Sequence, residues 1–76
     1  MPNLLMSESQ VLSHLGKKIR ECRISKKMTQ DELANACGFE KARISRIENG
    51  YINSTIISLH KICDALGIQV KELFTD

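Results

Sequence analysis

Apolar residues recur at three- and four-residue steps along most of this chain, and no stretch shows the two-residue alternation of a strand. The spacing is clearest from Ser9 to Lys26, where Leu12, Leu15, Ile19 and Cys22 would line one face of a helix. A helix with one apolar face must bury that face against another element. We therefore predict an all-α fold without a sheet.

Caps and glycines divide the remaining chain into four more short helices. Thr29 and Glu32 form the Thr-x-x-Glu pattern of a capping box, and Gly38 follows the segment that they start. The further helices are expected from Thr29 to Ala36–Cys37, from Lys41 to Asn49 before Gly50, from a cap on Ser54 or Thr55 to Gly67, and from Val70 to Phe74. Their inward-facing residues are predicted to be Leu33, Ala34, Ile44, Ile47, Ile56, Leu59, Ile62, Cys63, Leu66, Val70, Leu73 and Phe74. The predicted fold class is a compact bundle of five short helices.

The length of 76 residues is enough for one domain, which we place at residues 9–76, with residues 1–8 as an N-terminal arm without fixed structure. A chain this short buries only about 60% of the surface that its unfolded form exposes, so dense helix packing or a partner subunit would have to add to its stability. The opening residues have neither a basic start nor a long apolar run, and no membrane span is expected. We expect a protein of the reducing cytoplasm.

The cysteines and histidines do not predict a chemical site. Cys22, Cys37 and Cys63 are odd in number and lack a Cys-x-x-Cys spacing, and they fall at positions where a thiol serves as a small apolar residue. His14 and His60 are far apart in the sequence, and no nucleophile–base pair or glycine-rich phosphate loop is present. We expect no disulfide, no metal, no cofactor and no enzymatic activity.

Positive charge is concentrated in the first helix. Between Lys17 and Lys27 there are six basic residues and one acidic residue, although the net charge of the whole chain is only +2. From Tyr51 onward, two basic residues stand against three acidic ones. One end of the molecule should therefore attract phosphate, unless this stretch is only a solvated helix face. Aromatic residues are scarce, which argues against a stacking platform for single-stranded nucleic acid and leaves binding of duplex DNA open.

The segment from Thr29 to Gly50 has the layout of a helix-turn-helix, with two short helices and a tight turn at Gly38. Ala34 would let the two helices approach closely, and Ile44 and Ile47 would fix the second helix on the first. The outer face of the second helix then carries Lys41, Ala42, Ser45 and Arg46, with Arg43 to one side. Such side chains can reach base edges in a major groove.

The pieces LGKKIRECR, MTQDELA, ISRIENG, ALGI and ELF occur in the order and spacing of the phage-repressor and Cro class, also called the xenobiotic-response-element helix-turn-helix family. The chain resembles that family from about Leu15 to Phe74. The resemblance implies a five-helix, lambda-repressor-like domain that binds an operator as a dimer. The helix from Lys41 to Asn49 of each subunit would enter the major groove, with half-sites about one helical turn apart.

The resemblance also implies roles for single residues. Gln30 matches a position that touches a phosphate, and Arg43 and Asn49 match positions near the sugar-phosphate backbone. Arg23 and Glu48 match a pair that forms a structural salt bridge between the first helix, Ser9–Lys26, and the end of the helix from Lys41 to Asn49. The base-facing positions are matched by Lys41, Ala42, Ser45 and Arg46. Alternative roles remain open. Gln30 could be an ordinary polar residue at a helix start, and Arg46 or Lys41 could contact a phosphate or an acidic side chain instead of a base. Ala42 and Ser45 could simply face solvent.

The sequence also departs from the family pattern. Glu40 stands where a serine or threonine usually caps the helix that begins at Lys41. Lys27 stands where a glycine usually ends the first helix. A strained or differently closed turn is expected at Lys27. Apolar residues replace the usual charged ones at Ile24 and Ile57. With Tyr51 and Ile52, these could form an exposed patch that contributes to a dimer interface.

Two functions follow from these observations. The first is a sequence-specific transcriptional regulator that binds a palindromic duplex operator as a homodimer. The second is an antitoxin or adaptor whose main role is to bind a protein partner, through the region Tyr51–Ile57 or the last helix. Duplex binding by the isolated protein and the identity of any co-purifying protein would distinguish the two.

Overall fold

The computed structural model describes residues 6–74, which form four α-helices and one 3-10 helix. The elements are α1 (Glu8–Ser25), α2 (Gln30–Cys37), α3 (Lys41–Glu48), α4 (Ile56–Leu66) and η1 (Val70–Phe74). No strand occurs within residues 6–74, so the all-α prediction is confirmed. The count of five α-helices is wrong, because the last segment is a 3-10 helix. Five residues give little room for i to i+4 bonds, and short runs often take the tighter i to i+3 pattern, as in the bond from Glu72 N to Gln69 O.

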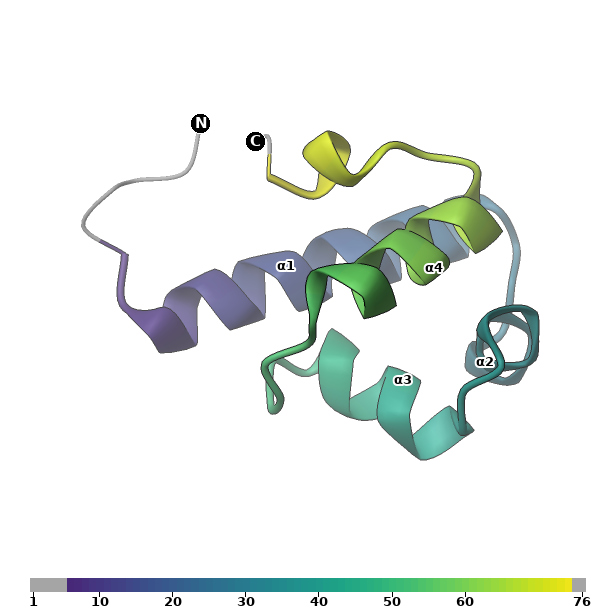
Figure 1. The fold of residues 1–76 in the computed structure, drawn as a ribbon, viewed down its shortest axis with the longest axis horizontal. Helices are drawn as coiled ribbons and strands as arrows, with labels where there is room; N and C mark the ends of the chain where they lie inside the picture. Colours follow the sequence, from purple (N-terminus) through teal and green to yellow (C-terminus); the bar gives the residue numbers. More distant parts are fainter. Residues whose placement is uncertain (1–5, 75–76) are drawn as a thin grey trace.

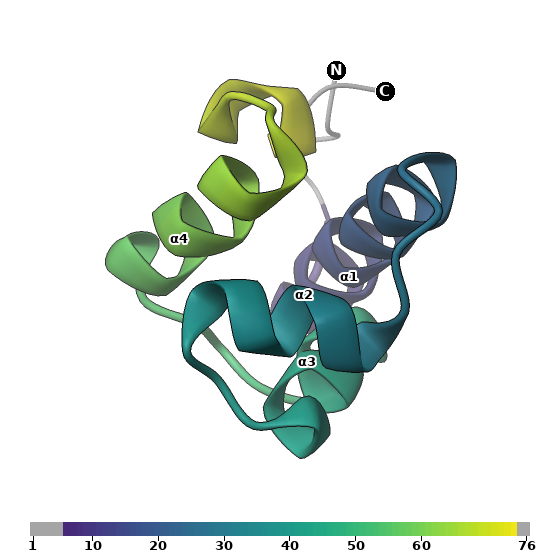
Figure 2. The ribbon, with the colours of Figure 1, turned by 90° about the vertical axis from the view of Figure 1, so that its right-hand side faces the viewer.

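The helices enclose one small core. Figure 1 shows α1 along the length of the molecule, with α3 on one side of it and η1 on the other. Figure 2 shows α2 crossing in front of α3, below α4, when the molecule is viewed from the end at which α2 lies. The buried apolar side chains are Leu15, Ile19, Leu33, Ala34, Cys37, Ile44, Ile47, Leu59, Ile62, Cys63, Leu66 and Leu73. Every helix thus contributes to the core, as the three- and four-residue spacing predicts.

Three residues expected in this core lie outside it. Leu12, in the first half of α1, is half-buried and does not belong to the core or to the residues packed against it. Ile56 is 61% exposed because it is the first residue of α4, at the edge of the bundle. Phe74 is 39% exposed at the end of η1, where Leu73 fills the core position instead. Val70 is partly buried against the core, as predicted.

The ends of α1 differ slightly from the sequence-based range. The helix begins at Glu8, one residue earlier than expected, because Ser7 caps it and Gln10 completes a capping box. Of the arm expected over residues 1–8, Ser7 and Glu8 therefore form the start of α1, and residues 1–5 lie outside the described residues. At the other end, Lys27 has a φ of +57°. This left-handed conformation is unfavourable for a residue with a Cβ, so the strained turn expected there is present.

α1 and α3 make their closest approach at Gly16. A Cβ added to Gly16 would lie 2.5 Å from the carbonyl oxygen of Glu48 and would also overlap the carbonyl oxygen of Ile47. Both neighbours are backbone atoms, which cannot move away as a flexible side chain could. A glycine at this position therefore sets how closely the C-terminal end of α3 lies against α1.

Candidate nucleic-acid interface

The outward face of α3 carries the residues predicted to read DNA. Lys41, Ala42, Arg46 and Asn49 are exposed, and Ser45 is half-buried between them. These five residues are alternately one and three positions apart in the sequence, which places them on one side of a helix. Ile44, Ile47 and Glu48 form the opposite, buried side. The structure thus presents the predicted set together on one surface.

The ends of α3 are closed in different ways. Glu40 takes the extended conformation of an N-cap, but its side chain makes no capping hydrogen bond, in keeping with the weak cap expected there. At the other end, Asn49 Nδ2 donates to Ser45 O at 2.9 Å. Gly50 follows with a φ of +73°, and Tyr51 N donates to Arg46 O at 2.9 Å. The C-terminal turn of α3 is therefore held by a side chain as well as by the backbone, whereas its first turn has only backbone bonds, from Arg43 N and Ile44 N to Glu40 O.

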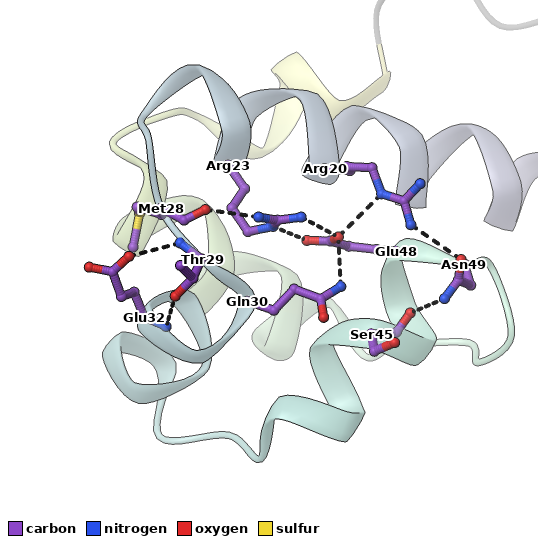
Figure 3. A network of polar contacts seen from close by, with 9 residues as sticks. All are labelled: Arg20, Arg23, Met28, Thr29, Gln30, Glu32, Ser45, Glu48 and Asn49. Carbon is purple, nitrogen blue, oxygen red and sulfur yellow. Dashed lines mark hydrogen bonds and ion pairs between the residues drawn. The ribbon is translucent and has the colours of Figure 1, made fainter.

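The buried carboxylate of Glu48 is the centre of a polar network that joins α1, α2 and α3 (Figure 3). Its side chain has no exposed surface. Arg23 Nε donates to Glu48 Oε2 at 2.6 Å, and Arg23 Nη2 donates to Oε1 at 3.0 Å. Arg23 Nη1 also donates to Met28 O at 2.8 Å, in the turn between α1 and α2. The structural salt bridge inferred from the sequence is present in this geometry.

The environment of Glu48 favours its ionised form. Burial by itself would raise the pKa of the Glu48 carboxyl, but the hydrogen bond from Arg23, the hydrogen bond from Gln30 and the charge of Arg23 together outweigh it. The net result is a pKa below the ordinary glutamate value. The hydrogen bond with Glu48 correspondingly raises the pKa of Arg23. The pair is therefore a fixed ion pair at neutral pH.

Gln30 contributes to this network from the first position of α2. Its Nε2 donates to Glu48 Oε1 at 3.1 Å. An amide NH2 group has two hydrogens, so one N–H of Gln30 remains for another acceptor. Thr29 and Glu32 hold the helix start with a reciprocal capping box, at 2.8 and 3.0 Å. The side chain of Gln30 is thus positioned by the network, beside the N-terminus of α2.

Arg43 is directed toward α4 rather than along the outer face of α3. Its Nη2 donates to Ser58 Oγ at 2.7 Å, and its guanidinium lies 4.1 Å from the centre of the Phe39 ring. Ser58 Oγ also accepts from Thr55 Oγ1 at 3.1 Å, at the capped start of α4. Arg43 therefore links the turn before α3 to α4, a role that the sequence does not indicate.

The four apolar residues considered for a dimer patch do not lie together. Ile52 is half-buried and packs on the core, whereas Tyr51 and Ile57 are exposed. Ile24 is exposed in the last turn of α1, at the end of the molecule away from the loop that joins α3 to α4 (Figure 1). The exposed apolar surface near that loop instead includes Ile56.

Sequence reasoning missed two residues that shape this face. Gly16 is inside the matching piece LGKKIRECR, but only the contact with α3 shows why a side chain does not fit there. The sequence indicates Arg20 only as part of the basic stretch, yet its Nε lies 3.4 Å from Glu48 Oε1 and its Nη2 donates to Asn49 Oδ1 at 3.3 Å. The spacing of Arg20 and Arg23 on α1, one helical turn apart, was the available signal.

The cysteines are free thiols in or against the core. Burial raises the pKa of Cys37, and it raises the pKa of Cys63 to about 11. Both thiols therefore remain protonated at neutral pH. Within residues 6–74, no three histidine, cysteine or acidic side chains gather as a metal site would require. No helix of this part of the chain is long and apolar enough to span a membrane.

Comparison with known proteins identifies the family and supports the fold of the chain. Residues 19–73 match the helix-turn-helix family HTH_3. The control protein C.BamHI of Bacillus amyloliquefaciens is 42% identical over 59 residues, which cover 76% of this chain and 73% of that protein. The crystal structure of the restriction-modification controller protein C.AhdI from Aeromonas hydrophila superposes with a TM-score of 0.81 at 32% identity, covering 83% of this chain and 96% of that one. The clp gene regulator ClgR from Corynebacterium glutamicum gives a TM-score of 0.81 at 30% identity, covering 84% of this chain and 83% of that one.

Proposed function

Because the chain belongs to the helix-turn-helix family, we propose that it is a transcriptional regulator that binds a specific duplex operator as a homodimer. The observation that carries the proposal is the outer face of α3. Its predicted DNA-reading residues Lys41, Ala42 and Arg46 are exposed around a half-buried Ser45, while its inner face is bonded to α1 and α2. Such a rigid support is what a reading helix requires, since a small shift would misplace every contact.

The reading contacts are assigned to the exposed residues of α3. Arg46 has a forked guanidinium suited to the O6 and N7 atoms of guanine, and Lys41 offers a single flexible donor. Ala42 and Ser45 are short enough to let the helix backbone approach the bases, and either can contact a thymine methyl group. Glu40, at the start of the same helix, can accept a hydrogen bond from cytosine N4.

Contacts to the DNA backbone would fix the position of α3 in the groove. Gln30 has one amide hydrogen left beyond its bond to Glu48, and the N-terminus of α2 adds backbone N–H groups. Asn49, at the C-terminal end of α3, is exposed on the same side as Arg46. Arg43 is the weakest of these assignments, because its guanidinium already bonds to Ser58 and stacks on Phe39. We assign it first to holding α3 against α4.

The apolar surface beside the α3–α4 loop supports a dimer. Tyr51, Ile56 and Ile57 are each more than 60% exposed. Association of a second copy through this surface would remove them from water. A domain of this size buries a smaller share of its surface than a larger one does, so such a contact would add to its stability. A two-fold dimer then requires an operator with two-fold symmetry.

The biological role is proposed from the relatives. C.BamHI is named as a control protein, C.AhdI as a restriction-modification controller protein, and ClgR as a clp gene regulator. We propose that this chain likewise regulates transcription without an enzymatic activity, in the cytoplasm with the DNA. Its activity as a regulator would then be controlled through the protein concentration, through dimerisation or through a partner.

Selection of binding sites from a random duplex pool tests the proposal. The purified protein should enrich a palindrome, and its affinity for that duplex should fall steeply as the salt concentration rises. A matched pool selected with the variant Lys41→Ala, Arg46→Ala, which removes two outer side chains of α3, should yield no palindrome. Weak, sequence-independent binding by the wild-type protein would contradict the proposal. It would favour the alternative role in binding a protein partner.

A further inference from the structure

Two guanidinium groups of α1 share the single buried carboxylate of Glu48 (Figure 3). Arg23 makes the short, bidentate contact, and only 12% of its side chain is exposed. Arg20 makes a longer contact of 3.4 Å, and 45% of its side chain is exposed. The carboxylate is therefore neutralised by Arg23, and Arg20 is not needed to balance it.

The cluster consequently carries one surplus positive charge, and the exposure of the two side chains places that charge on Arg20. Most exposed basic side chains on a helix move freely and lose entropy when a ligand fixes them. Arg20 is already held at both edges of its guanidinium, by Glu48 Oε1 and by Asn49 Oδ1 at 3.3 Å. Of its five N–H groups, these two bonds use two, so three remain for another acceptor.

The position of this guanidinium identifies that acceptor. Asn49 is the residue that ends α3, and it lies on the face that presents Arg46. Gln30 approaches the same carboxylate oxygen from the start of α2. Figure 3 shows a chain of contacts that runs from Gln30 on α2 through Glu48 and Arg20 to Asn49 at the end of α3. An anion that lies along this chain of contacts would meet the free hydrogens of Gln30 and of Arg20.

We propose that Arg20 binds a phosphate of the operator backbone where the C-terminal end of α3 leaves the major groove. The inference rests on the proposed function and adds a DNA contact from α1, outside the helix-turn-helix segment. A guanidinium matches the spacing of two phosphate oxygens, and a fixed one gains more affinity per hydrogen bond than a mobile one. The contact fixes the register of α3 and carries no base preference of its own.

The salt dependence of binding to the selected operator tests this contact. Each phosphate neutralised in duplex DNA contributes about 0.9 to the slope of log affinity against log salt. Between 50 and 200 mM salt, one such contact corresponds to about a 3.5-fold loss of affinity per protomer. The variant Arg20→Gln should show this reduction in slope, and it should lose affinity equally for operator and unrelated duplexes. Arg20→Lys, which keeps the charge, should retain most of the slope.

A control variant separates a local contact from a change in net charge. Lys71 is exposed on η1, which lies on the opposite side of α1 from α3 (Figure 1). The variant Lys71→Gln changes the net charge by the same amount and should leave the salt slope at the wild-type value. A reduction equal to that of Arg20→Gln would overturn the proposal, because the effect would then come from the total charge.

A duplex with single uncharged methylphosphonate linkages locates the contact. At one linkage in each half-site, the substitution should weaken the wild-type protein and leave Arg20→Gln unaffected. Equal sensitivity of both proteins at every linkage would show that Arg20 has only a structural role, as would an unchanged salt slope. If the wild-type protein binds no duplex, the proposed function fails together with this contact. If the wild-type protein binds the operator and Arg20→Gln shows the same salt slope and the same linkage sensitivity, only the proposed Arg20 contact fails.

Discussion

Replacement of Glu48 by glutamine tests how much the buried ion pair contributes to the fold. The change keeps the shape of the side chain but removes the charge that Arg23 and Arg20 share. It also places an NH2 group where one carboxylate oxygen accepted a hydrogen bond. Arg23, with 12% of its side chain exposed, would then hold a charge that neither solvent nor a carboxylate compensates. Breaking a buried pair in this way costs about 3–5 kcal/mol.

That cost is large for a chain of this length. Small domains have a free energy of unfolding of about 0.05–0.15 kcal/mol per residue, so the loss would remove much of the stability of 76 residues. Urea denaturation followed by the helical circular dichroism signal measures it. The double variant Arg23→Met, Glu48→Met should recover part of the loss, since it leaves no unpaired charge between these two positions. A loss below about 1 kcal/mol for Glu48→Gln would refute this account of the network.

The pH dependence of stability gives a second measure of the same carboxylate. The pKa of Glu48 is lower in the folded state than the ordinary value of about 4.3, so its contribution to stability is fully present above that value. The contribution is lost as the pH falls through the lower, folded-state pKa. The difference in unfolding free energy between wild type and Glu48→Gln should therefore shrink below about pH 4. A difference that stays constant down to pH 2 would contradict the assignment.

Four further substitutions give separate tests. Gly16→Ala should destabilise the fold by about 1–3 kcal/mol in urea denaturation, because its Cβ would meet the backbone of α3, whereas Lys17→Ala beside it should have little effect. Lys27→Gly should stabilise by about 0.5–1 kcal/mol, since it relieves the left-handed strain at φ +57° and loses part of that gain to chain entropy; an unchanged midpoint would contradict this. Ile57→Lys should shift the sedimentation equilibrium toward monomer, and Ile24→Lys, with a similar exposure at the far end of α1, should not. Arg46→Ala should weaken operator binding by about 1–3 kcal/mol and relax the preference at one base position, which a repeated site selection would detect.

Local signals in the sequence predict most of the elements. The capping box of Thr29 and Glu32 is present as expected, and α2 ends at a left-handed Gly38. The unusual Lys27 and the weak cap at Glu40 were also visible as departures from a pattern. These features depend on residues within four positions of one another, where the sequence spacing nearly determines the geometry.

Contacts between distant segments could not be predicted in the same way. Periodicity assigns Ile56 to the apolar side of α4, but it does not indicate that the first turn of α4 lies at the edge of the bundle. The bond from Arg43 to Ser58 joins positions 15 residues apart, and the bond from Arg20 to Asn49 joins positions 29 residues apart. Which of several basic residues makes such a bond depends on the angle at which the helices pack, and composition carries no information on that angle.

The arrangement around Glu48 separates what holds α3 from what α3 presents. A helix of eight residues is too short to be stable by itself, so its orientation depends on contacts with its neighbours. Those contacts come from its inner side, through Ile44, Ile47 and Glu48. A substitution on the inner side should therefore change stability and DNA affinity together. A substitution at Lys41 or Arg46 should change affinity and base preference while stability stays constant, so the operator preference of this fold can vary without loss of the fold.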